Sequence, residues 1–121
     1  MTNGTIKKHD DVIEFVRAML IKEGCNVKIN KSNQKNNGIN DTDSKGNKIK
    51  IYPDLYTFEE KIVKRIYEVE TEDSVEESQV PQWKQYAKGV DFYLVVPKSM
   101  LEKAQELSEE KNIEVKDFLT Y

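Results

Sequence analysis

The chain has 121 residues, of which 37% are hydrophobic and 34% are charged, a composition that fits one domain with a modest core. Its 19 basic and 22 acidic residues give a net charge of −3, which argues against a protein that coats polyanions through overall positive charge. The single cysteine, Cys25, excludes an intrachain disulfide, and no apolar run is long enough to span a bilayer. We therefore expect one cytoplasmic domain over residues 1–121, with no membrane association.

The N-terminal half predicts a helix followed by two strands. Apolar residues at helical spacing predict an amphipathic helix over residues 9–23. Residues 25–30 and 48–52 alternate apolar and polar side chains, as half-buried strands do. Between these strands, residues 30–47 contain six asparagines and two glycines and predict a long, flexible loop.

The middle of the chain predicts a turn, a strand and a helix. Residues 58–64 are interpreted as a short turn, and residues 65–71 as the third strand. Pro81 is tolerated only in the first turn of a helix, so a helix is expected over residues 78–88. Trp83 lies on the apolar stripe of this helix, which favours core packing over base stacking.

The C-terminal part predicts a strand, a helix and a last strand. Residues 91–97 are almost continuously apolar, as in a strand covered on both faces. Ser99 and Glu102 have the spacing of a capping box at the start of a helix, and residues 113–121 are interpreted as a last strand or tail. The resulting order, α-β-β-β-α-β-α-β, predicts an α/β fold with a mixed central sheet flanked by helices on both faces.

Acidic residues gather after the third predicted strand, with six acids and no base from Glu68 to Glu77. The two-residue period of a strand places Glu68 and Glu70 on the same face as Ile66, near the sheet interior. Partly buried carboxylates need a countercharge or must take up protons. Oxygen ligands favour Mg²⁺ or Mn²⁺ as that countercharge.

The residues Pro53–Asp54, followed after a short gap by the sequence EVE at 68–70, resemble the motif of the PD-(D/E)xK nuclease superfamily. The sequence QWKQY at 82–86 resembles the Q-x-x-x-Y helix motif of RecB-like and related branches. The order of elements is also similar to the α-β-β-β-α-β core of this restriction-endonuclease-like fold, followed here by a further helix and short strand. Each motif alone is weakly specific, whereas their order and spacing together are more so.

The resemblance implies a metal site and its neighbours. Asp54 and Glu68 would bind Mg²⁺ or Mn²⁺ with the backbone carbonyl of Val69, and Gln82 would orient near the site. Glu14 matches the acidic residue that resolvase-like members carry on the first helix, and it is equally placed to pair with Arg17 on the helix surface. His9, the only histidine, is set aside as a residue at a helix start.

One position departs from the family pattern, because Glu70 stands where the motif has lysine. Glu70 would act as a further metal ligand or as general base, or the lysine role would pass to Lys84 or Lys88 on the following helix. A third alternative is a degenerate site that keeps the fold without the chemistry.

The expected function is metal-dependent hydrolysis of phosphodiesters in nucleic acid, with DNA as the first expectation and an endonuclease as the expected enzyme type. The alternative is a catalytically degenerate module of the same fold that binds nucleic acid or assembles with protein. The small size of the domain leads us to expect a homodimer or a subunit of a larger complex.

Overall fold

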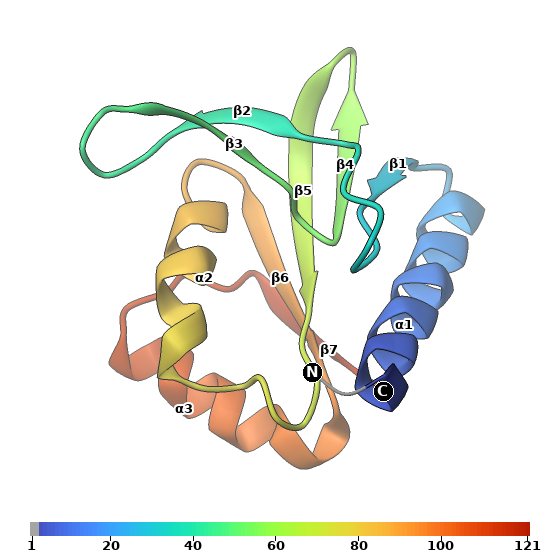
Figure 1. The fold of residues 1–121 in the computed structure, drawn as a ribbon, viewed down its shortest axis with the longest axis vertical. Coiled ribbons are helices and arrows are strands. Elements are labelled where there is room, and N and C mark those ends of the chain that lie inside the picture. The colour runs from blue at the N-terminus through green and yellow to red at the C-terminus, as the bar shows by residue number, and fades with distance from the viewer. Residues whose placement is uncertain (1–2) are drawn as a thin grey trace.

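The computed structural model describes residues 3–121, which form a mixed α/β domain. A five-stranded mixed sheet lies between three α-helices, with α1 on one face and α2 and α3 on the other (Figure 1). Within these residues no helix has the length and apolarity needed to cross a membrane. The predicted class, a mixed sheet covered by helices on both faces, is therefore confirmed.

The five-stranded sheet has the order β1-β4-β5-β6-β7. Its strands are β1 (Asn26–Ile29), β4 (Leu55–Glu59), β5 (Ile62–Val69), β6 (Asp91–Val96) and β7 (Asp117–Thr120). The pairs β1–β4 and β4–β5 are antiparallel, whereas β5–β6 and β6–β7 are parallel. The parallel pairs require crossovers, and α2 (Val80–Tyr86) and α3 (Leu101–Glu110) provide them on the same face of the sheet (Figure 1).

Two apolar clusters hold the helices to the sheet. Trp83 of α2 has no exposed surface and packs with Ile66 and Phe92 on one face. On the other face, α1 (Asn3–Lys22) packs its buried stripe against Tyr67 and Val69. Ile66 therefore faces α2 while Tyr67 and Val69 face α1, which confirms the predicted alternation along this strand.

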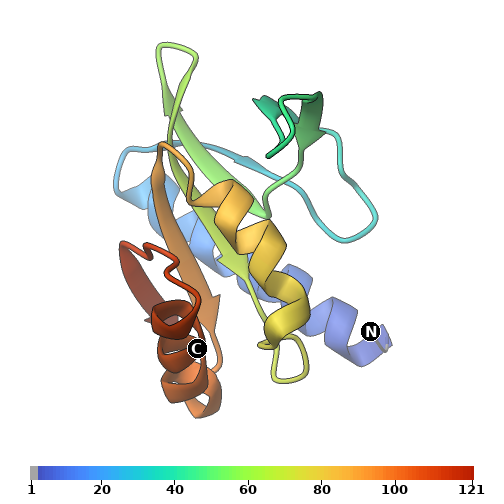
Figure 2. The same cartoon turned by 90° about the vertical axis from the view of Figure 1, so that its left-hand side faces the viewer.

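The second strand of the central sheet is not the one predicted from sequence. The predicted strand at 48–52 is β3 (Lys48–Ile51), which pairs with β2 (Ile39–Thr42) in a separate two-stranded sheet. Figure 2 shows this hairpin standing apart from the central sheet beside α2. Alternation of apolar and polar residues predicts a half-buried strand but does not indicate which strand it pairs with. The sequence pattern therefore could not show that residues 48–51 belong to a separate hairpin and not to the central sheet.

The prediction of a turn over residues 58–64 was wrong, because β4 and β5 occupy most of that segment. The tight turn between them lies at Glu60 and Lys61, which both have positive φ angles (49° and 68°). Two-residue hairpin turns of this kind usually carry Asn or Gly. A Glu-Lys pair does not indicate a hairpin turn, so the sequence pattern does not predict β4.

Helix boundaries also differ from the prediction. α1 begins at Asn3, six residues before the predicted start, which places His9 inside the helix. α2 begins at Val80 after a 3-10 turn, η1 (Glu77–Gln79), and Pro81 lies in its first turn as expected. A second 3-10 turn, η2 (Lys98–Met100), precedes α3, and no side chain caps that helix, so the predicted capping box is absent.

The Asn-rich segment from 30 to 47 has more structure than the predicted loop. It contains β2, and its first part, residues 30–37, is fastened at both ends by the buried side chain of Asn30. Asn30 Nδ2 donates to the carbonyls of Asn37 (2.8 Å) and Pro53 (2.7 Å), and its Oδ1 accepts from the N–H of Asn37 (2.9 Å). We call residues 30–37 the pinned loop.

The first prediction concerns Asn30. Asn30→Ala removes three hydrogen bonds and leaves buried backbone groups without partners, so we expect a loss of about 2–3 kcal/mol in the free energy of unfolding. Urea denaturation measures this loss. Asn33→Ala, at an exposed position of the same loop, is the matched control and should change stability by less than about 0.5 kcal/mol. Equal stability of both variants would show that the loop is not held by Asn30.

Candidate active site

Three carboxylates meet where β4 begins and β5 ends. Asp54 immediately precedes β4, Glu68 is the second-last residue of β5, and Glu70 follows that strand. All three are buried, with relative exposures of 8%, 5% and 3%. The antiparallel pairing of β4 with β5 brings these positions together, because Leu55 is opposite Tyr67. The predicted meeting of these acids is thus a property of the strand register.

The carboxylates lie in a cavity of about 210 Å³. The cavity is bounded by α1, by the pinned loop, by the strand ends and by the segment that leads into α2. Its lining residues are His9, Ser32, Lys35, Tyr52, Asp54, Glu68, Val69, Glu70, Ser74, Gln79 and Gln82. Five predicted site residues, Asp54, Glu68, Val69, Glu70 and Gln82, are therefore brought to one cavity.

Asp54 is the most connected of the three acids. Its Oδ2 accepts from the backbone N–H of Val69 (2.8 Å) and from His9 Nε2 (3.0 Å). Its own backbone N–H donates to Glu68 Oε1 (3.1 Å). Asp54 thus links β4 to both β5 and α1.

Glu68 and Glu70 have raised pKa values because burial removes them from water. For Glu68 the nearby charges of Asp54 and Glu70 add to burial, and its pKa lies well above the usual range. Burial also raises the pKa of Glu70, to about 7, although hydrogen bonds from Ser74 and Trp83 act in the opposite direction. Ser74 Oγ donates to Glu70 Oε2 (2.6 Å) and Trp83 Nε1 donates to Oε1 (3.1 Å).

His9 is a site residue that the expected helix start at residue 9 does not indicate. Burial alone would lower its pKa, but hydrogen bonds and charge from Asp54 and Asp10 outweigh burial and raise the pKa to about 9. At neutral pH the imidazolium donates from Nε2 to Asp54 and from Nδ1 to Asp10 Oδ1 (3.0 Å). The helix periodicity carried a weak signal for this role, since His9 precedes the apolar Val12, Ile13 and Val16 by helical spacings on the inner face of α1.

A serine, a histidine and an aspartate are in contact, but they do not form a nucleophilic triad. Ser32 Oγ lies 3.2 Å from His9 Nδ1 and donates to Asp10 Oδ1 (2.8 Å). An imidazole whose pKa is about 9 is already protonated at neutral pH, so it cannot take the hydroxyl proton as a general base. Ser32 therefore fastens the pinned loop to α1.

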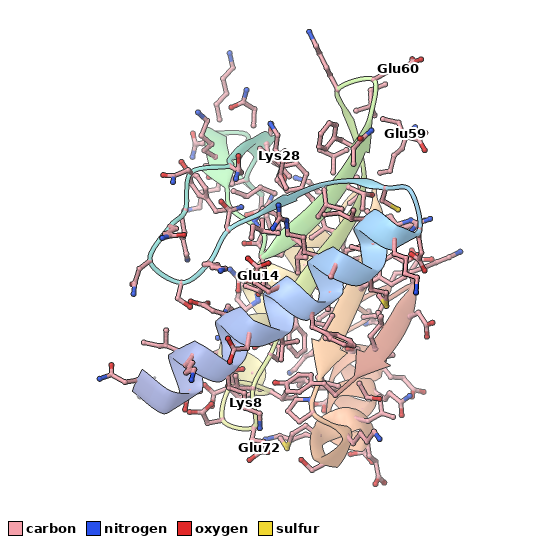
Figure 3. All side chains as sticks on the ribbon, turned by 90° about the vertical axis from the view of Figure 1, so that its right-hand side faces the viewer. Lys8, Glu14, Lys28, Glu59, Glu60 and Glu72 are labelled. Carbon is pink, nitrogen blue, oxygen red and sulfur yellow. The ribbon has the colours of Figure 1, made fainter. Side chains whose placement is uncertain are left out.

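Glu14, Lys84 and Lys88 do not line the cavity. Glu14 is on the surface of α1 (Figure 3), where its carboxylate pairs with Lys31 (2.9 Å) and Arg17 (3.4 Å). Lys88 lies beyond the end of α2 and not on that helix as predicted, and its Nζ donates to the carbonyl of Thr42 (2.6 Å) in the β2–β3 hairpin. Lys84 is exposed on α2 and does not line the cavity. Gln82 does line the cavity, and its Nε2 donates to Tyr86 Oη (2.9 Å).

The carboxylate oxygens of the cavity are the ligands that a hard divalent cation prefers. Glu68 and Glu70 are buried with raised pKa values, and the positive charge near them is too small to offset their burial. The positions of the side chains fit less well. Within residues 3–121, no group of three or more His, Cys, Asp or Glu side chains is arranged to hold a metal ion. Asp54 is engaged by His9, and Glu70 by Ser74 and Trp83. A cation would therefore have to compete with these contacts.

No protein-family model, curated protein or solved structure matches the chain. The assignment of a function therefore rests on the geometry of the cavity and on the spacing of its residues.

The second prediction concerns pH. Above pH 5, the raised pKa values of Glu68, Glu70 and His9 all lower the stability of the metal-free protein as pH rises. Ionisation of Glu70 is disfavoured in the folded state, so stability falls as pH rises from its ordinary pKa of 4.5 through about 7, and the burial of Glu68 acts in the same direction. The contribution of His9 is complete below pH 6.5 and is lost as pH rises through about 9. We expect Glu70 and His9 each to change the free energy of unfolding by about 1–3 kcal/mol.

Thermal melts of metal-free protein between pH 5 and pH 9 measure this dependence. Glu70→Gln should reduce the pH dependence below pH 7, and His9→Gln should reduce it between pH 6.5 and pH 9. Glu14→Gln is the control, because its exposed carboxylate has a lowered pKa and is fully ionised in this range. A melting temperature that rises steadily from pH 5 to pH 9 would contradict the electrostatic description of the cavity.

Proposed function

We propose that this protein is a metal-dependent nuclease of the PD-(D/E)xK type, which hydrolyses phosphodiesters in nucleic acid. The observation that carries the proposal is the group of three buried carboxylates, Asp54, Glu68 and Glu70, at adjacent strand ends in one cavity. Burying three neighbouring acids costs stability without a countercharge, and such a cost is typical of functional sites.

The arrangement of the sheet supports the same proposal. If the β2–β3 hairpin is treated as an insertion between β1 and β4, the chain order is α1 and then the antiparallel strands β1, β4 and β5. The helix α2 then crosses over to β6, which is parallel to β5. The PD residues then lie at the start of the second strand, and the ExE residues at the end of the third strand, of the restriction-endonuclease-like order. Gln82 reaches the same cavity from the crossover helix.

Each residue has a distinct role in the proposed site. Asp54 and Glu68, with the carbonyl of Val69, would hold Mg²⁺ or Mn²⁺, which when bound polarises a phosphate and lowers the pKa of water. Glu70, whose pKa is raised to about 7 by burial, has the proton affinity of a general base near neutral pH. Trp83 and Ser74 orient its carboxylate through their hydrogen bonds.

A second candidate function is a nuclease-like module without catalytic activity. The observation that favours it is the His9 imidazolium, which already neutralises Asp54 within hydrogen-bonding distance. A protein cation in this position stabilises the acidic cluster without metal. Such a module would serve nucleic-acid binding or assembly, as a homodimer or within a larger complex.

The third prediction tests the metal site. Saturating Mn²⁺ or Mg²⁺ should stabilise the protein by mass action, by about 2.7 kcal/mol at one hundred times the dissociation constant. Asp54→Asn and Glu68→Gln should abolish the response in thermal melts and calorimetric titration. Glu14→Gln, which removes an acid outside the cavity, should preserve it. Identical melts of the native protein with and without metal would favour the module over the nuclease.

The fourth prediction concerns Glu70 and uses cleavage of plasmid, branched DNA and structured RNA with Mg²⁺ or Mn²⁺. Glu70→Gln keeps the size of the side chain but removes its basicity, so the cleavage rate should fall by about 10²–10⁴-fold. The same substitution removes a buried charge and should stabilise the metal-free protein. Full activity of Glu70→Gln would show that another group activates the water. Absence of metal-dependent cleavage by the native protein on all three substrates would favour the module.

A further inference from the structure

One basic side chain at the cavity has no ion-pair partner among residues 3–121. Its two basic residues are His9 and Lys35. His9 is engaged on both ring nitrogens by Asp54 and Asp10. Lys35 has neither an ion pair nor a side-chain hydrogen bond with any part of the chain from residue 3 to residue 121. Lys35 is therefore the basic group at this cavity that remains available to a ligand.

The backbone that carries Lys35 is fixed to the backbone that carries Asp54. The buried Asn30 side chain fastens the ends of the pinned loop, and the N–H of Asn30 donates to the carbonyl of Asp54 (2.8 Å). Ser32 attaches the middle of the loop to Asp10 through its N–H (3.1 Å) and its hydroxyl (2.8 Å). Lys35 thus reaches the cavity from a loop whose position is set by the site itself.

The other candidate lysines have different positions. Lys88 is used to hold the β2–β3 hairpin, through the carbonyl of Thr42 (2.6 Å) and the carboxylate of Asp41 (3.8 Å). Lys84 is exposed on α2 and lies outside the cavity. Among residues 3–121, Lys35 is the only lysine that lines it.

The cavity presents three acidic residues to an approaching phosphodiester. One of them, Glu70, occupies the position at which the PD-(D/E)xK motif has a lysine. An anionic substrate needs a cation near its non-bridging oxygens, and lysine is a compact charge on a flexible stem that serves this purpose. We propose that Lys35 is the phosphate-binding residue of this site and contacts a non-bridging oxygen of the nucleic-acid backbone. This inference rests on the proposed function and identifies which residue recognises the substrate charge.

Binding without turnover provides the first test, by fluorescence anisotropy of a labelled DNA duplex with Ca²⁺ in place of Mg²⁺. Lys35→Ala should weaken binding, and the slope of log affinity against log salt should fall by about 0.9, the value for one lost phosphate contact. Lys35→Arg should retain most of the slope. Lys103→Ala, an exposed lysine on α3, is the matched control and should leave the slope unchanged.

Single-turnover cleavage with Mg²⁺ provides the second test. Lys35→Ala should lower the rate by about 10- to 100-fold, as expected for a removed contact to a charged group, while the metal-induced rise in melting temperature stays unchanged. If Lys35→Ala has the salt slope and cleavage rate of the native protein, or if Lys84→Ala lowers both by the same amounts, the role of Lys35 is overturned. The proposed function is not affected by either result. A native protein that binds neither a DNA duplex, nor branched DNA, nor structured RNA would overturn both this inference and the proposed function.

Discussion

The Asp54 carboxylate joins the parts of the molecule that form the cavity. Through the N–H of Val69 it holds β4 to the end of β5, and through His9 it holds both strands to α1. The carbonyl of the same residue accepts from Asn30, so the pinned loop is attached there as well. A side chain that would bind metal is therefore also a structural link, and loss of its charge affects the packing of α1 as well as the chemistry.

Much of the cavity could be predicted because it depends on strand geometry. The two-residue period placed Glu68 and Glu70 on the face of Ile66, and the hydrogen bond from Trp83 to Glu70 agrees with that face. The strand β6, which is covered on both faces, and the helix start near Pro81 could also be predicted from the sequence. Long apolar runs and proline are compatible with few local structures.

The remaining features depend on contacts between segments that are distant in sequence. β4 was missed because the Glu60–Lys61 turn adopts positive φ angles without glycine or asparagine. His9 was missed because its role comes from Asp54, 45 residues away, and not from a motif around it. The pinned loop was interpreted as flexible because asparagine is common in loops, whereas one buried asparagine here satisfies three hydrogen bonds.

The hydrogen bond from Trp83 to Glu70 has a practical consequence. Trp83 is the only tryptophan of the chain, it has no exposed surface, and its indole N–H donates to an acid of the cavity. The emission of an indole responds to the charge and polarity of its surroundings. The protein therefore contains a single tryptophan, and we expect its emission to report the protonation of Glu70 and the arrival of any ligand that alters that carboxylate, without an added label.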